Sequence, residues 1–415
     1  MTLRAPAALL ALLLLLAACQ LEEERAPRDA ASDEAASGAF TTLGDDRLPT
    51  QAALDSARYV GRGRRQVGVD TAGLAAAARN NPETLEEIGT ARDWSTRLHL
   101  PLGGDIAGPS VLKAQVLLDR AGFSPGEIDG RWGDNTELAV SWFQKSAGLP
   151  ATGIVDEATV RALGQKAGRT DQLVVTRRLT AEDVEGEFAE LPEDVYERAE
   201  LDRQGFESLA EKLGETYHAS PDLLARLNDG VDLDGLQAGD SLRVPNVMGA
   251  PRVNGDVSRV VISAAAGYLH ALAADGRVLF HAPVTVGASY DPSPEGELQI
   301  TSVTPDPWWH YQPAILESVP DDEPSARLPP GPNNAVGVVW MALSKEHYGI
   351  HGTSAPGTIG YASSAGCVRL TNWDARRLAE MVGAGTVVRF RDPAGQPGAR
   401  PGADSTRAAS RRQSV

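Results

Sequence analysis

Residues 348–370 read YGIHGTSAPGTIGYASSAGCVRL, and this segment carries the strongest chemical signal in the 415-residue chain. It contains Cys367, one of two cysteines in the sequence, and a histidine, His351, upstream of it. Gly349 and Gly352 lie on either side of His351 and Gly366 directly precedes Cys367, so the backbone there can turn sharply. A cysteine in this setting is a buried apolar residue, half of a disulfide, a metal ligand or a nucleophile. The rest of the sequence narrows these four possibilities.

The other cysteine, Cys19, ends an apolar run that follows Arg4. The run is shorter than the roughly 20 residues that a membrane-spanning helix needs, and it predicts a signal peptide over residues 1–18. The sequence LAAC at 16–19 resembles a bacterial lipobox, which implies lipidation of Cys19 and attachment to a membrane. Gln20 resembles the residue found there in lipoproteins of the outer membrane, so we expect the protein on the periplasmic face of that membrane. The alternative is a secreted periplasmic protein with an incidental cysteine.

A lipidated Cys19 leaves Cys367 without a disulfide partner in its own chain. In an oxidising compartment such a cysteine is either buried and inert or reactive. The sequence has no CxxC, HExxH or comparable cluster, so we expect neither a metal nor another cofactor. The net charge of −17 argues against nucleic acid and against an anionic membrane surface as partners.

The length predicts two or three domains. Residues 19–50 are acidic and rich in Ala and Ser, which is typical of a flexible tether. Residues 51–109 contain candidate short helices to which we assign no function. Residues 392–415 are rich in Pro, Gly, Ser and Arg, and we expect a disordered tail.

Residues 110–166 show helical spacing of apolar residues and turn signals between the helices. We expect Asn135 or Thr136 to cap the second helix and Asp156 or Thr159 to open the third. The purely structural interpretation is a small three-helix module with aromatic residues in its core. However, IDGRWGDNTELAVSWFQKSAGLPATGIVD closely resembles the peptidoglycan-binding three-helix domain, which implies a cell-wall partner. The matching positions are Asp129, Gly130, Gly133, Thr136, Ala139, Val140, Phe143, Gln144, Gly148, Leu149, Gly153 and Asp156.

Residues 198–247 predict two helices, the second capped near Ser220-Pro221, and a short strand at 241–244. The part LLARLN…AGDSLRVP resembles a LysM-type glycan-binding module. A degenerate linker domain is the alternative, so glycan binding by this segment stays open.

Residues 256–391 predict a mostly β domain with a single helix after the cysteine segment. Several runs are rich in β-branched residues, and Asp275-Gly276 between two of them is typical of a two-residue hairpin. Asn372 is a candidate cap for the helix, and TVVRF at 386–390 predicts a closing strand.

A nucleophilic cysteine needs a base or cation, backbone donors for the developing oxyanion, and an accessible surface. His351 supplies the candidate base, and Gly366 lets backbone amides approach a substrate. Arg369 lies two residues beyond the cysteine and shares its face in an extended chain, where a guanidinium suits a substrate carboxylate. A buried cysteine and a structural histidine are the alternative on these features alone.

The motif as a whole is more specific than these separate features. GPNNAVG followed by IHGTSAPGTIGYASSAGCVRL resembles the catalytic segment of L,D-transpeptidases with the YkuD-type fold, over about residues 256–391. The resemblance implies a mixed β-sandwich or barrel-like domain with Cys367 as nucleophile and His351 as its base. It implies that the carbonyl of Gly352 orients the imidazole and that amides of Gly366 and Cys367, with Ala365, stabilise the oxyanion.

The same resemblance implies substrate contacts at Arg369, Ser364, Tyr348, Trp340 and Tyr311. Tyr311 belongs to the segment WWHYQP, whose residues Trp308, Trp309 and His310 are further candidates for the wall of the groove, although core packing explains the aromatic residues equally well. Many relatives have a second histidine where this chain has Ala365, which leaves His351 as the imidazole of the motif.

The implied reaction is transfer of a peptidoglycan stem tetrapeptide, through a Cys367 acyl-enzyme, to a second stem or to another amine such as that of a wall-linked protein. Two rivals remain. A carboxypeptidase or hydrolase of the same fold would release the acyl group to water, and a non-catalytic wall-binding lipoprotein would keep Cys367 inert.

Overall fold

The computed structural model describes residues 71–251, 255–287, 292–313 and 323–391. The predicted signal peptide, Cys19, the tether and the tail lie outside these ranges. Within them, no helix combines the length and the apolar character needed to cross a membrane.

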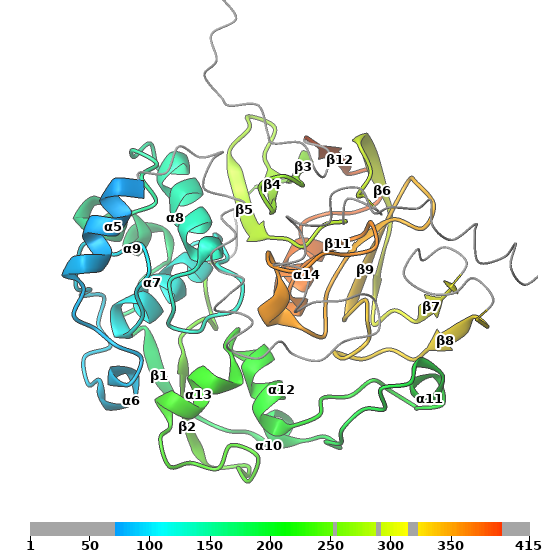
Figure 1. The fold of residues 1–415 in the computed structure, drawn as a ribbon, viewed down its shortest axis with the longest axis horizontal. Helices are drawn as coiled ribbons and strands as arrows, with labels where there is room; N and C mark the ends of the chain where they lie inside the picture. The colour runs from blue at the N-terminus through cyan, green and yellow to red at the C-terminus, as the bar shows by residue number, and fades with distance from the viewer. Residues whose placement is uncertain (1–70, 252–254, 288–291, 314–322, 392–415) are drawn as a thin grey trace, which may run out of the picture. The chain divides into compact units, whose positions relative to one another are not determined.

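The first described region is helical (Figure 1). Helices α5 (Thr71–Asn80) and α6 (Glu87–Thr90) precede α7 (Pro109–Arg120), α8 (Asp134–Ser146) and α9 (Glu157–Lys166). As expected, Asp156 caps α9 by accepting the N–H of Thr159. The predicted cap of α8 was wrong, because Gly133 is the capping residue and makes no side-chain bond. Asn135 lies inside the first turn, and its side chain is used elsewhere.

The next module contains a strand that the sequence interpretation missed. β1 (Val174–Arg178) pairs antiparallel with β2 (Ser241–Pro245), and α12 (Leu209–Thr216) and α13 (Pro221–Leu227) lie between them in the chain. The predicted module began at 198, because the short run at 174–178 finds its partner far along the chain. Ser220 caps α13 as predicted. The buried side chains of this module and of the helical module form one continuous core, which includes Ile88, Leu112, Leu163, Leu213 and Leu242.

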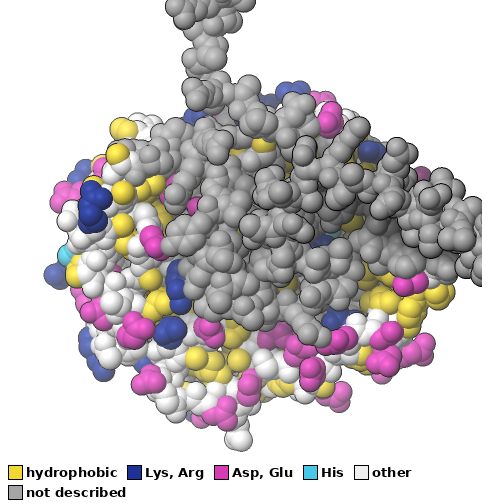
Figure 2. Space-filling view, viewed as in Figure 1, with side chains coloured by type: hydrophobic (Ala, Val, Ile, Leu, Met, Phe, Trp, Pro, Cys, Tyr) yellow, Lys and Arg dark blue, Asp and Glu magenta, His cyan; other side chains and the backbone are white. Residues whose placement is uncertain are grey.

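An arm connects β1 to α12 and includes α10 (Ala181–Val184) and α11 (Val195–Ala199). The arm is rich in Asp and Glu, and acidic side chains are frequent along the lower edge of the face in Figure 2. It runs to the small sheet of β7 (Trp309–Tyr311) and β8 (Ala326–Leu328), where the hydroxyl of Tyr196 donates to the carbonyl of Pro324 at 2.9 Å.

The C-terminal domain is built on one curled, mixed sheet of eight strands rather than on two packed sheets. The chain beyond β5 reaches the opposite edge, where Thr285 and Arg369 exchange N–H···O bonds of 3.1 and 2.8 Å. This bridge closes the curled sheet, which accounts for the barrel-like character implied by the sequence. The strand order is β11 (Val368–Arg369), β10 (Gly349–His351), β9 (Val339–Leu343), β6 (Gly296–Pro305), β12 (Val387–Phe390), β3 (Arg259–Ser263), β4 (Tyr268–Leu272) and β5 (Val278–Pro283).

Two local predictions in this domain need correction. The predicted hairpin at Asp275-Gly276 is present, since β4 and β5 pair antiparallel, but its turn is longer than two residues and is closed by the bond from the N–H of Ala273 to the carbonyl of Arg277. Helix α14 (Asn372–Ala379) is capped by Thr371, whose hydroxyl accepts the N–H of Asp374, so Asn372 is the first helical residue. Its side chain is therefore available for other contacts.

The helical module and the sheet share hydrogen bonds. The N–H of Ser124 donates to the carbonyl of His281 on edge strand β5, and the N–H of His281 donates to the carbonyl of Gly122, both at 2.9 Å. Phe123 stacks on the His281 ring. The helical module thus covers a strand edge that would otherwise be open to pairing.

Candidate active site

Three neighbouring strands bring the predicted site residues together. In the register of the sheet, His351 on β10 lies between Trp340 on β9 and Arg369 on β11. Side chains at one register position point to the same face. Cys367 lies in the bend just before β11 and lines the same cavity as these three residues. Strand pairing thus assembles residues that are separated in sequence.

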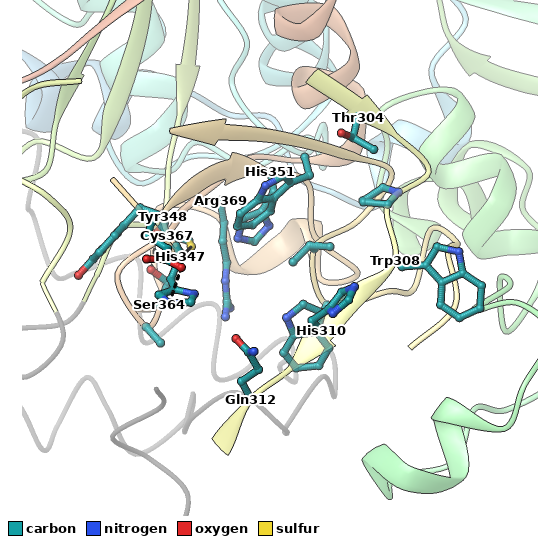
Figure 3. Close-up of a pocket in the computed structure, with 17 residues that line it drawn as sticks. Thr304, Trp308, His310, Gln312, His347, Tyr348, His351, Ser364, Cys367 and Arg369 are labelled. Atoms are coloured by element: carbon teal, nitrogen blue, oxygen red, sulfur yellow. Dashed lines mark hydrogen bonds and ion pairs between the residues drawn. The ribbon is translucent and has the colours of Figure 1, made fainter. Parts of the chain in front are cut away.

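This face lines a cavity of about 520 Å³ (Figure 3). The cavity contains most of the predicted site residues, namely Cys367, His351, Arg369, Ala365, Ser364, Tyr348 and Trp340. Among the described residues, Gly352, Gly366 and Tyr311 lie outside the lining. Tyr311 is buried and its hydroxyl donates to a carboxylate oxygen of Glu323 at 3.0 Å.

His351 is buried, and its protonation follows from one contact. Its Nδ1 lies 2.7 Å from the carbonyl oxygen of Gly352. Because a carbonyl only accepts hydrogen bonds, Nδ1 carries the proton and Nε2 keeps its lone pair. Burial lowers the pKa of His351 to about 3, and the nearby guanidinium of Arg369 adds to the effect. The imidazole is therefore neutral at neutral pH and can accept a proton through Nε2.

The indole of Trp340 stacks on His351, with ring centroids 5.4 Å apart and an angle of 22° between the planes. Gly349 makes this possible. A Cβ at that position would lie 2.5 Å from an indole carbon of Trp340. Gly349, two residues before His351, thus allows the ring packing on this face of the sheet.

Cys367 is a free cysteine of intermediate exposure. Its Sγ lies 3.6 Å from the carbonyl oxygen of His347, to which the thiol donates. The hydroxyl of Ser364 donates to the carbonyl of Cys367 itself. Ser364 thus uses its hydroxyl proton within the loop that carries the cysteine.

The sequence interpretation missed His347, which adopts a left-handed backbone conformation with φ of 66° and brings a second imidazole into the cavity. His310, from the WWHYQP segment that we expected at the wall of the groove, brings a third. With Ala365 in place of a histidine, the motif contains one imidazole, that of His351, but the cavity contains three. The position of His347 next to Tyr348, a predicted site residue, was the sequence feature that could have identified it. Other lining residues that we did not single out are Thr304, Pro307, Gln312, Ala335, Val336 and Glu346.

In the part of the chain that the structure describes, no group of three or more His, Cys, Asp or Glu side chains is arranged to hold a metal ion.

Two family models match the sequence. The L,D-transpeptidase catalytic domain, YkuD, matches residues 258–390, and the "Putative peptidoglycan binding domain" matches residues 107–163. Relatives from Bacillus licheniformis and Bacillus subtilis, both named "Putative L,D-transpeptidase YkuD", are 29% and 34% identical to this chain. The first match covers 43% of this chain and 90% of the relative, and the second covers 37% and 76%. This chain belongs to the L,D-transpeptidase family.

A shorter match, 45% identical over 67 residues, links this L,D-transpeptidase to the "Probable L,D-transpeptidase YbiS" of Escherichia coli, over 16% of this chain and 22% of that protein. The two matching domains together support a transpeptidase-type function with peptidoglycan as substrate.

Proposed function

We propose that this L,D-transpeptidase transfers peptidoglycan stem tetrapeptides through a thioester on Cys367 and joins two diaminopimelate residues. The observation that carries the proposal is the neutral, buried His351 in the cavity that also contains Cys367 and Arg369. A base, a nucleophile and a cation thus meet where a peptide can enter.

In the first half-reaction, Nε2 of His351 takes the thiol proton while Sγ attacks the carbonyl of the diaminopimelate residue. Amides of the loop 365–367 stabilise the oxyanion. The tetrahedral intermediate collapses, the bond to the terminal D-alanine breaks, and His351 returns the proton to the leaving amine. The carbonyl of Gly352 holds the imidazole in the required tautomer throughout.

In the second half-reaction, an acceptor amine attacks the thioester and loses a proton to His351, and Cys367 leaves as the thiol. Arg369 binds a carboxylate of the donor stem, since a guanidinium pairs with carboxylates through two hydrogen bonds. Tyr348 and Trp340 form walls of the donor groove, and the exposed Trp308 extends the aromatic surface.

Mass spectrometry of the products tests the transfer. Protein lacking residues 1–50 is incubated with disaccharide tetrapeptides. We expect dimers joined through two diaminopimelates from the wild type and none from Cys367→Ser. Shortened stems without dimers would instead support a carboxypeptidase or hydrolase. Adding a protein with a free Lys amine tests the alternative acceptor.

A carbapenem separates the enzyme from a non-catalytic wall-binding protein. We expect a covalent adduct of one molecule per chain on Cys367, and a reaction slowed by about 10²-fold or more in His351→Ala, since a positioned base contributes at least this much. An unmodified Cys367 after long incubation would contradict the proposed chemistry.

For the N-terminal part, we propose a lipid on Cys19, the tether 19–50, and wall binding by residues 107–163 with the LysM-like module. A tethered enzyme with a wall-binding domain meets stem peptides at a high effective concentration. Labelling with a fatty-acid analogue should fail in Cys19→Ala. Binding to purified sacculi, with and without residues 107–163, tests the wall-binding role.

A further inference from the structure

Ser293 is a buried residue, 4% exposed, that precedes β6 and lies far in sequence from the cysteine segment. Its hydroxyl donates to the carbonyl oxygen of Gly366 at 2.8 Å and accepts the N–H of Gly287 at 2.9 Å. A hydroxyl has one proton to donate and lone pairs to accept with, so both bonds form at once. Ser293 therefore joins the chain after β5 to the peptide bond that enters Cys367.

This peptide bond fixes the direction of a backbone donor. In a planar trans peptide, the carbonyl of Gly366 and the N–H of Cys367 point in opposite directions. Ala365 and Cys367 line the cavity and Ser293 does not, so the carbonyl is held on the side of the loop away from the cavity. The N–H of Cys367 is then directed toward the cavity. Gly366 has φ of 83°, a left-handed conformation that favours glycine.

The next carbonyl along the chain is held in the same way, because the hydroxyl of Ser364 donates to the carbonyl of Cys367. Two serines, from different segments, thus fix the two peptide units on either side of the nucleophile.

We propose that Ser293 is a positioning residue for the oxyanion hole: by holding the carbonyl of Gly366, it directs the N–H of Cys367 at the developing oxyanion. The inference rests on the proposed Cys367 acyl-enzyme and adds a residue to it. Without the hydroxyl, the 366–367 peptide loses its anchor and can rotate, and the amide is no longer directed at the oxyanion before reaction. Such preorganisation is the main source of oxyanion stabilisation.

The test compares two reactions of the same thiol. Acylation by a carbapenem passes through an oxyanion, whereas alkylation by iodoacetamide displaces iodide at a saturated carbon and builds none. For Ser293→Ala we expect acylation to slow by about 10-fold to 100-fold, somewhat less than the loss of a whole oxyanion donor. Alkylation should stay within about twofold of the wild-type rate, because the positioning role leaves the thiol and His351 untouched.

A pair of isosteric variants separates loss of the hydroxyl from disturbed folding or packing. Ser293→Thr keeps the hydroxyl, and Ser293→Val has the same shape without it. We expect Thr to retain most of the acylation rate and Val to lose it as Ala does. Equal losses in Thr and Val would show a packing effect and overturn the proposal, as would parallel losses of acylation and alkylation in Ser293→Ala. Ser302→Ala, on the exposed part of β6, is the matched control.

Failure of the proposed function and failure of the Ser293 role give different results. If the wild-type protein forms no adduct on Cys367, the proposed function fails. If the wild type is acylated, and Ser293→Ala and Ser293→Val are acylated as fast as the wild type, only the positioning role of Ser293 fails.

Discussion

At the scale of single residues, the chemistry depends on burial as much as on residue type. His351 can accept a proton at Nε2 because the carbonyl of Gly352 fixes its Nδ1 proton and because burial keeps the ring neutral. Cys367 remains partly accessible and lines the same cavity. The pair therefore differs from a preformed thiolate and imidazolium, since the imidazole is neutral until it takes the thiol proton.

The pH dependence of acylation follows from the lowered pKa of His351, which is about 3. A histidine with an ordinary pKa would lose its basic form as the pH falls through about 6.5. We expect the rate of carbapenem acylation to change by less than about threefold between pH 7 and pH 5. A rate that falls with a midpoint near the ordinary value would contradict a neutral buried base.

The same pKa shift affects stability, and its sign can be stated. The unfolded imidazole binds a proton at a higher pH than the folded one. Above about pH 6.5 His351 is neutral in both states and does not lower the unfolding free energy. As the pH falls from 6.5 toward 3, the unfolded imidazole gains a proton that the folded one does not, so the unfolding free energy decreases. The unfolding free energy of the wild type should decrease between pH 7 and pH 5. In urea unfolding, this decrease should be smaller in His351→Gln, which has no imidazole to protonate. An unchanged pH dependence would contradict the shift.

Gly349 offers a second prediction at this scale. A Cβ in Gly349→Ala would lie 2.5 Å from the Trp340 ring, so the indole must move away from His351. We expect a loss of about 1–3 kcal/mol in unfolding free energy and slower acylation. Gly383→Ala is the control, because a Cβ there meets no atom within 4 Å. Equal stability of the two variants would show that the stacked geometry is not required.

At the scale of elements, α14 anchors the catalytic segment through its first residue. Asn372 is buried, and its side-chain oxygen accepts the N–H groups of Val338 and Thr353, both at 3.2 Å. Its amide donates to the carbonyl of Pro332 at 3.1 Å and to Glu215 of α12 at 2.7 Å. One side chain thus fixes the loops before β9 and after β10 and links them to the neighbouring module.

Replacing Asn372 with Ala leaves these buried groups without a partner. We expect Asn372→Ala to lower the unfolding free energy by about 2–4 kcal/mol, since each unsatisfied buried group costs roughly 1–3 kcal/mol and some regain water. Urea unfolding measures the change. Asn80→Ala, at the exposed end of α5, should change it by less than about 0.5 kcal/mol. A similar small effect at Asn372 would contradict its anchoring role.

At the scale of the molecule, the helical module is bonded to the segment that carries the candidate site. The side chain of Asn135 donates to the carbonyl of Ile359 at 2.8 Å, in the loop between His351 and Cys367. Residues 122–124 cover the edge of β5, and the hydroxyl of Ser124 donates to the buried carboxyl of Asp374 on α14 at 2.7 Å. Burial raises the pKa of Asp374 to about 6.

These contacts predict cooperative unfolding. In calorimetry, residues 71–391 should unfold in one transition, because separating the modules would expose the edge of β5 and break buried polar contacts. The isolated segment 256–391 should be less stable than the same residues in the full chain. Two well-separated transitions, with the second unchanged in the isolated segment, would contradict this coupling.

The sequence by itself determined the local features: the caps of α9 and α13, the helix after the cysteine, and the identity of Cys367, His351 and Arg369 as candidates. Such features depend on neighbours in the chain and leave a readable pattern. The cap of α8 could not be predicted, because the Asn135 side chain bonds to Ile359 far along the chain instead. The β4–β5 connection is longer than predicted because local bonds among residues 273–277 close a wider turn.

Only the tertiary structure decided which residues share the cavity and in what state. β1 was missed because its partner strand lies far along the chain, and His347 was missed because no motif includes it. Ser293 meets Gly366 through the closing of a curled sheet, and His351 is neutral because the fold buries it. Pairing across long sequence separations and the exclusion of water are properties of the assembled chain, so a linear pattern contains the residues of this site but not their arrangement.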